Sequence, residues 1–174
     1  MRKIKSLLIA AIGIFAITVG CNDDFLLKEP LGQIAGPTLN NADGVEGKLV
    51  AAYRTLSGQG MNGGGTWYYD IHGWIFGSIA SDNAVKGTDA GDQPEHSFIE
   101  AYDFTTFNVH IRDKWRSVYW GMARANEVID AVAEAAEGDD PVEAGRAAQI
   151  IAEARFLRAF HGLQGQLHFR NPAY

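Results

Sequence analysis

Residues 111–129 read I-R-D-K-W-R-S-V-Y-W-G-M-A-R-A-N-E-V-I and determine how the rest of the chain is organised. Apolar side chains recur here at steps of three and four, the spacing that stacks side chains on one face of an α-helix. This spacing predicts a long amphipathic helix. Its apolar stripe continues slightly beyond the quoted stretch and consists of Ile111, Trp115, Val118, Tyr119, Met122, Ala125, Ile129 and Val132.

A helix with one apolar stripe needs a partner that covers it. The next periodic run, residues 144–167, has a stripe of the same spacing and is predicted to pair with the first helix as an antiparallel hairpin. In the connecting sequence, Gly138 suits the end of the first helix and Asp140 suits the N-cap of the second. Pro141 would then occupy N1 and Glu143 would occupy N3. The second stripe consists of Ala147, Ile150, Ile151, Ala154, Leu157 and His161.

Two segments of this hairpin carry a specific sequence resemblance. They are W-R-S-V-Y-W-G-M-A-R-A-N-E-V-I at residues 115–129 and A-E-A-R-F-L-R-A-F at residues 152–160. Both resemble, almost letter for letter, the W…Y…AN..I and EARFLRAF signatures of the SusD/RagB family. That family consists of outer-membrane lipoproteins that bind nutrients beside a TonB-dependent transporter. The resemblance implies a mainly α fold, built from tetratricopeptide-like helical hairpins and a long irregular loop region.

The N-terminus is typical of an exported protein. Residues 1–20 combine three positive charges with an apolar stretch too short for a comfortable membrane span, which predicts a signal peptide. Cys21 follows directly and is the only cysteine, so it resembles the lipid-attachment residue of a bacterial lipoprotein. Thr18 stands where such a site usually has leucine. An ordinary signal peptide with an incidental cysteine, or a short membrane anchor, is therefore the alternative.

The resemblance divides the rest of the chain into two parts. Residues 21–40 are predicted to be a lipidated N-terminal tether, and residues 41–174 are predicted to be a SusD-like N-terminal helical domain. This domain is expected to be incomplete, because family members are considerably longer. Its first helix is predicted between residues 40 and 58, with Asn40 or Asn41 as the N-cap. The stripe of that helix consists of Val45, Leu49, Ala52, Tyr53 and Leu56.

The glycine-rich stretch between residues 66 and 103 holds the candidate ligand site. Aromatic rings stack on the apolar face of a sugar, and carboxylates and amides bind its hydroxyls. Trp74 and Phe76 are assigned to core packing instead, within a helix predicted over residues 74–85 and broken at Gly77. The ligand-binding candidates are Trp67, Tyr68, Tyr69, Asp82 and Asn83, of which the last two also suit a helix cap.

The charge of the chain and its lack of known motifs argue against several classes of ligand. Cleavage of the signal peptide would remove three of the 15 Lys and Arg but none of the 21 Asp and Glu. The mature chain would then have a net charge of 12 − 21 = −9. No nucleic-acid partner is therefore expected. Zinc motifs are absent from the sequence, and the acidic loop at residues 86–96 lacks the calcium-loop pattern, so neither a metal site nor a cofactor is predicted. His161 is assigned to the core. Arg155 and Arg158 are assigned to structural roles, either ion pairs with acidic partners such as Glu153 or Glu127 or hydrogen bonds to a neighbouring loop.

The expected function follows from the resemblance. It implies a lipid-anchored, surface-exposed outer-membrane protein that binds a glycan or oligosaccharide beside a SusC-like TonB-dependent transporter and that is not an enzyme. Peptide uptake is an alternative, since some members of this family serve it. Other interpretations are a helical-repeat protein-interaction module without a sugar site, a non-functional truncated remnant, and a secreted glycoside hydrolase.

Overall fold

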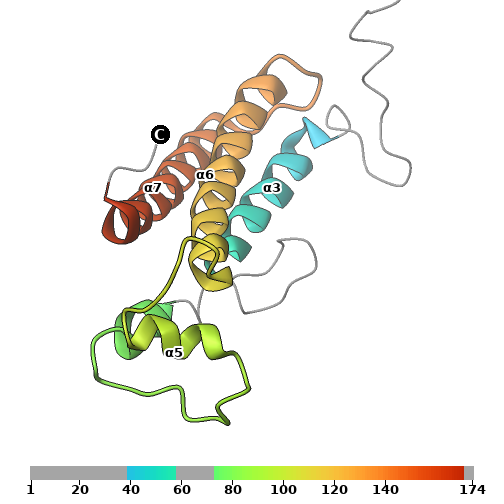
Figure 1. The fold of residues 1–174 in the computed structure, drawn as a ribbon. Helices are drawn as coiled ribbons and strands as arrows, with labels where there is room; N and C mark the ends of the chain where they lie inside the picture. Colours follow the sequence, from blue (N-terminus) through green and yellow to red (C-terminus); the bar gives the residue numbers. More distant parts are fainter. Residues whose placement is uncertain (1–38, 58–72, 171–174) are drawn as a thin grey trace, which may run out of the picture. The chain divides into compact units, whose positions relative to one another are not determined.

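The computed structural model describes residues 39–57 and 73–170, which lie in the second of two compact units, residues 37–174. These residues form helices and no strand, so the predicted mainly α class is confirmed (Figure 1). Cys21, Trp67, Tyr68 and Tyr69 lie outside the described residues, as do the predicted signal peptide and nearly all of the tether. The elements are α3 (Ala42–Arg54), the 3-10 turn η2 (Thr55–Ser57), the π-helical turn η4 (Ile75–Ile79), α5 (Pro94–Glu100), α6 (Val109–Ala136) and α7 (Ala144–Phe169).

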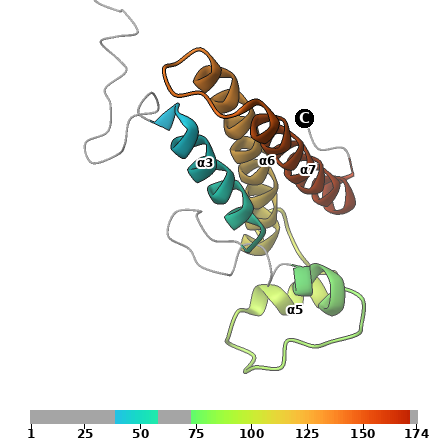
Figure 2. The same cartoon turned by 180° about the vertical axis from the view of Figure 1, so that it is seen from behind.

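The predicted hairpin is the long antiparallel pair α6 and α7, which lie side by side in both views of Figures 1 and 2. Burial of each large aliphatic side chain between them contributes roughly 1.5–3 kcal/mol. Trp115 departs from the predicted stripe, because it is 42% exposed and packs its ring on Tyr119 and Phe169. The core of the pair is formed mainly by Ala125, Val128, Val132, Ile150, Ala154 and Leu157.

Helix α3 covers one side of this hairpin and completes its core with Val45, Leu49 and Ala52. The predicted cap is confirmed at Asn41, whose side chain accepts a hydrogen bond from the backbone N–H of Gly44 at 2.8 Å. Gly44 has a steric role as well, because a Cβ there would lie 2.1 Å from the carbonyl oxygen of Leu39. The incoming chain therefore crosses the first turn of α3 at a distance that only glycine permits.

The predicted N-cap of α7 is wrong by three residues. Asp140 does not cap α7; its backbone carbonyl accepts a hydrogen bond from the N–H of Ala42, the first residue of α3. Glu143 is the cap, and its carboxylate accepts from the N–H groups of Gly145 and Arg146, both at 2.9 Å. These two bonds lower the pKa of Glu143. Because Asp140 in the connection bonds to α3, helix α7 begins only after the connection, at Ala144.

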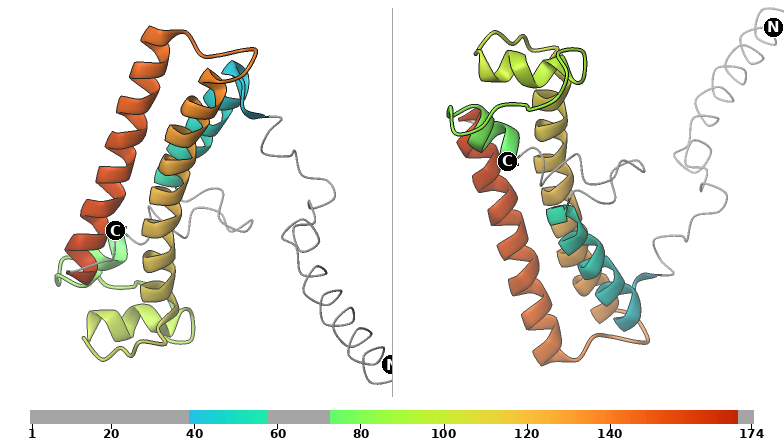
Figure 3. Two further views of the ribbon diagram at one scale, coloured as in Figure 1. Left: turned by 90° about the horizontal axis from the view of Figure 1, so that it is seen from above. Right: turned by 90° about the horizontal axis from the view of Figure 1, so that it is seen from below.

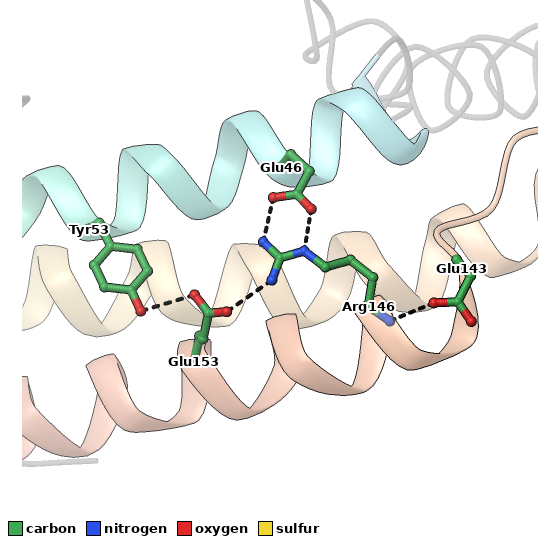
Figure 4. Close-up of polar contacts among 5 residues, drawn as sticks. All are labelled: Glu46, Tyr53, Glu143, Arg146 and Glu153. Atoms are coloured by element: carbon green, nitrogen blue, oxygen red, sulfur yellow. Dashed lines mark hydrogen bonds and ion pairs between the residues drawn. The ribbon is translucent and has the colours of Figure 1, made fainter.

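An arginine joins α3 to α7 (Figure 4). The guanidinium of Arg146 donates to both carboxylate oxygens of Glu46 on α3, at 2.5 and 2.7 Å, and to Glu153 further along α7, at 3.0 Å. The hydroxyl of Tyr53 donates to the other oxygen of Glu153, also at 3.0 Å. A fork-shaped pair of this kind specifies the orientation of α3 on the hairpin.

Replacing Arg146 with glutamine is expected to loosen α3 from the hairpin. The loss of overall stability should be small and should decrease with added salt, because the charges are partly exposed and screened. Hydrogen exchange of the α3 amides is the sensitive measurement, since detachment of α3 exposes them before global unfolding. The matched control is Arg124→Gln, which breaks the pair of Arg124 with Glu127 within α6 alone. Equal exchange in the two variants would refute the assigned role.

The predicted helix over residues 74–85 is largely replaced by the short turn η4, and α5, which was not predicted, follows after a loop. Ile75, Ile79 and Ile99 form a second small core between these elements, with Ile111 of α6 packed against it. Val85, the last residue of the predicted helix, is 66% exposed. Helix α5 lies at the N-terminal end of α6 (Figure 3). In the ranges that the structure describes, no helix combines the length and the apolar character needed to cross a membrane.

Candidate functional site

The two segments that carry the family resemblance face each other across the hairpin. The guanidinium of Arg158 on α7 donates a hydrogen bond to the side-chain oxygen of Asn126 on α6 at 3.0 Å, across 32 residues of sequence. Around this bond lies a groove of about 740 Å³, a volume typical of small-molecule sites. Its lining residues are Tyr119, Met122, Ala123 and Asn126 from α6, and Arg155, Arg158, Ala159, Gly162 and Leu163 from α7.

The groove lies on the side of the hairpin away from α3. Glu153 points to α3, where it binds Arg146 and Tyr53. Arg155 comes two residues later, which corresponds to about 200° around a helix. The groove residues of α7 are therefore turned away from α3.

Two arginines in the groove lack the carboxylate partners that were predicted for them. Glu153 is taken by Arg146 and Glu127 by Arg124. In the described part of the chain, Arg155 makes no ion pair or hydrogen bond, and Arg158 bonds only to Asn126. The predicted structural ion pairs are therefore wrong, because nearer arginines on the same helices occupy both glutamates. Two positive charges remain available to a ligand in the groove.

Tyr119 adds an aromatic ring to this groove. Its ring packs against Trp115 with centroids 4.7 Å apart. Its hydroxyl is buried and has no hydrogen-bond partner among the described residues. An unpaired buried polar atom is costly, and because this hydroxyl has no exposed surface, Tyr119 offers the groove its ring and not its O–H group.

A buried polar cluster lies deeper between the same two helices. Lys114 is completely buried and donates to the side-chain oxygen of Gln164 at 3.2 Å. Burial disfavours its charged form and lowers the pKa of Lys114 to about 8. The sequence did not predict this, because lysine in an amphipathic helix is normally assigned to the solvent-exposed face.

His161 is a core residue, as predicted, and has no exposed surface. The Thr55 hydroxyl donates to the carbonyl of Ala52, so its oxygen accepts from Nε2 of His161 at 2.9 Å. Burial, and then the nearby charge of Lys114, lower the pKa of His161 to about 4. The imidazole is therefore neutral at physiological pH and joins α7 to the end of α3.

The described residues contain no group of three or more His, Cys, Asp or Glu that could hold a metal ion. In the acidic loop, the ammonium of Lys86 donates to the backbone carbonyls of Asp89 and Asp92. The ammonium group of Lys86 thus occupies these two carbonyl oxygens, which are of the kind that bind cations. A pair of buried imidazoles, His96 and His110, lies where α5 meets α6, with ring centroids 4.0 Å apart and ring planes tilted by 41°.

Two of the predicted ligand-binding residues can be placed. Asp82 and Asn83 are exposed in the turn that follows η4, and neither lines the groove between α6 and α7. Neither residue caps the start of a helix, because the next one begins only at Pro94. Both follow the end of η4 instead, where Asp82 has a left-handed φ of 61° and the N–H of Asn83 donates to the carbonyl of Ser78 at 3.1 Å. Trp74, assigned to the core, is 40% exposed, whereas Phe76 is partly buried with its ring against His168.

The groove residues favour a ligand with an apolar face and a negative charge. The guanidiniums and an amide supply directed polar contacts, and Tyr119, Met122 and Leu163 supply apolar surface. The sequence pattern indicated the signature segments that form this groove, but their polar residues were assigned to structural roles. Comparisons of the chain with protein-family models, curated proteins and solved structures found no match.

Proposed function

We propose that this chain is a lipid-anchored, surface-exposed nutrient-binding component of an outer-membrane uptake system, similar to the SusD/RagB proteins. It binds a glycan or oligosaccharide and delivers it to a SusC-like TonB-dependent transporter. The observation that carries the proposal is the Arg158–Asn126 hydrogen bond, which joins the two segments that resemble the family signatures. On this proposal, α6 and α7 form one tetratricopeptide-like hairpin of a SusD-like N-terminal domain.

The proposed mechanism is capture without catalysis. A lipid on Cys21 holds the binding domain close to the membrane, so delivery to a transporter in the same membrane takes place at high effective concentration. Two sites could contribute to capture. One is the groove between α6 and α7, and the other is the stretch that contains Trp67, Tyr68, Tyr69, Asp82 and Asn83.

The proposal is tested by titrating the purified full chain with a panel of oligosaccharides and recording tryptophan fluorescence and binding heat. Saturable binding without product formation in a reducing-sugar assay is expected. Release of reducing ends would instead support the glycoside-hydrolase interpretation. Absence of binding to every sugar in the panel would count against the nutrient-binding function.

Replacing Cys21 with alanine is expected to release the protein from the membrane fraction, because the acceptor of the lipid is lost. Cell fractionation followed by immunoblotting measures the distribution. Asn22→Ala is the control, since it changes the neighbouring position and keeps the thiol. Membrane retention that is equal in the two variants would refute lipid attachment at Cys21.

A second candidate function is a helical protein-interaction module. It is favoured by the outer side of α7, where Phe156, Leu163 and Leu167 are 64%, 54% and 67% exposed. Exposed apolar residues gathered on one helix face often mark a contact with another protein. If this candidate function is correct, the wild type shows no sugar binding in titrations, and neither do the variants Phe156→Ser and Leu163→Ser. Both variants should, however, bind less of the partner protein that co-purifies with the wild type.

A further inference from the structure

We infer that the groove between α6 and α7 binds acidic oligosaccharides, with Arg155 and Arg158 as the partners of a sugar carboxylate. The inference rests on the proposed nutrient-binding function and specifies its ligand class. It also places the site in the hairpin rather than at the aromatic loop residues indicated by the sequence.

The first observation concerns charge. Arg112, Arg116, Arg124 and Arg146 each have an Asp or Glu oxygen within salt-bridge distance. The two groove arginines have none among the described residues, although the chain contains 21 acidic residues against 15 basic ones. Both groove arginines are exposed, so their guanidiniums can bind an external anion directly.

The second observation concerns geometry. Arg155 and Arg158 are three residues apart on α7, so their side chains leave the same part of the helix surface about one turn from each other. The bond to Asn126 restrains the guanidinium of Arg158. A planar guanidinium binds a carboxylate through two parallel hydrogen bonds, which makes this arrangement better suited to a carboxylate than to a neutral hydroxyl.

The third observation concerns the surface beside the arginines. Tyr119, Met122 and Leu163 line the same groove and offer apolar area, including one aromatic ring. A pyranose ring has an apolar C–H face that packs on such a surface, while its carboxylate projects from the ring edge. A uronic acid unit therefore satisfies the guanidiniums and the apolar wall together.

The test is isothermal titration calorimetry of the full chain, purified in detergent, with hexagalacturonate, maltohexaose and hexaglutamate as probes. The double variant Arg155→Gln/Arg158→Gln removes both guanidiniums of the groove. The control Arg112→Gln/Arg116→Gln removes the same charge from α6, where both arginines pair with Asp113. Circular dichroism verifies that each variant is folded.

The expected result is that the wild type and the control bind hexagalacturonate more tightly than maltohexaose, and that added salt weakens this binding. The groove variant should lose about tenfold in affinity for each guanidinium removed. Equal weakening of the groove variant and the control would overturn the inference, because net charge alone would then explain the effect.

The other outcomes separate this inference from the function on which it rests. Binding of maltohexaose alone, unchanged in the groove variant, would overturn the acidic-sugar site and leave nutrient binding intact. Binding of hexaglutamate without either sugar would overturn the acidic-sugar site and point to acidic peptides as ligands. Binding of no probe would overturn the inference and count against glycan capture as a whole.

Discussion

Replacing Gly121 with alanine is expected to destabilise the protein by about 3 kcal/mol. A Cβ at this position would lie 2.2 Å from Cε1 and Nε2 of His161, whose ring packs directly on the α6 backbone. The ring cannot move away without losing its hydrogen bond to Thr55. Overpacking of a core costs about 1–3 kcal/mol, loss of a buried hydrogen bond adds about 1 kcal/mol, and the higher helix propensity of alanine offsets about 0.5–1 kcal/mol of the sum.

Urea unfolding followed by circular dichroism measures this change in free energy. Gly47→Ala is the matched control, because Gly47 lies in the interior of α3 and a Cβ there meets no atom within 4 Å. That variant should be more stable than the wild type by about 0.5–1 kcal/mol, the usual gain from replacing a glycine inside a helix. A Gly121→Ala protein as stable as the wild type would show that His161 does not rest against α6.

Lowering the pH from 6.5 to 4 is expected to remove about 3 kcal/mol of stability through His161 alone. The pKa of His161 is lowered from its ordinary value of 6.5 to about 4 in the folded protein. Between these two values the unfolded chain binds a proton and the folded chain does not. The free energy of unfolding therefore falls as the pH decreases through this window, and the contribution of His161 is fully present only above pH 6.5.

The variant His161→Gln isolates this effect, because glutamine cannot gain the proton and its amide can still donate to Thr55. The free energy of unfolding should be measured for both proteins at several pH values between 4 and 7.5. Glu46 and Glu143, whose pKa values are also lowered, titrate in both proteins and cancel in the difference. The variant should lose less stability on acidification, and parallel curves would contradict the assigned burial of the imidazole.

The groove illustrates how much of the candidate site could be predicted from the sequence. The two signature segments are recognisable from their residues alone, and they do line one groove. The availability of Arg155 and Arg158 could not be predicted, because it depends on which arginine lies nearest to Glu153 and Glu127 in the packed helices. Charges of opposite sign within a turn of each other are too common in helices to specify their pairing.

The sequence by itself determined the three long helices α3, α6 and α7, since both the 3.6-residue period and the Asn41 cap arise within a few neighbouring residues. It also determined the hairpin, because two adjacent apolar stripes can cover each other only by folding back. Tertiary structure alone decided the burial of Lys114, the exposure of Trp115 and the use of Glu143 as a cap. Each of these depends on a contact between elements distant in sequence. Local pattern carries no information on such contacts, because the partner residues are specified only when the helices pack.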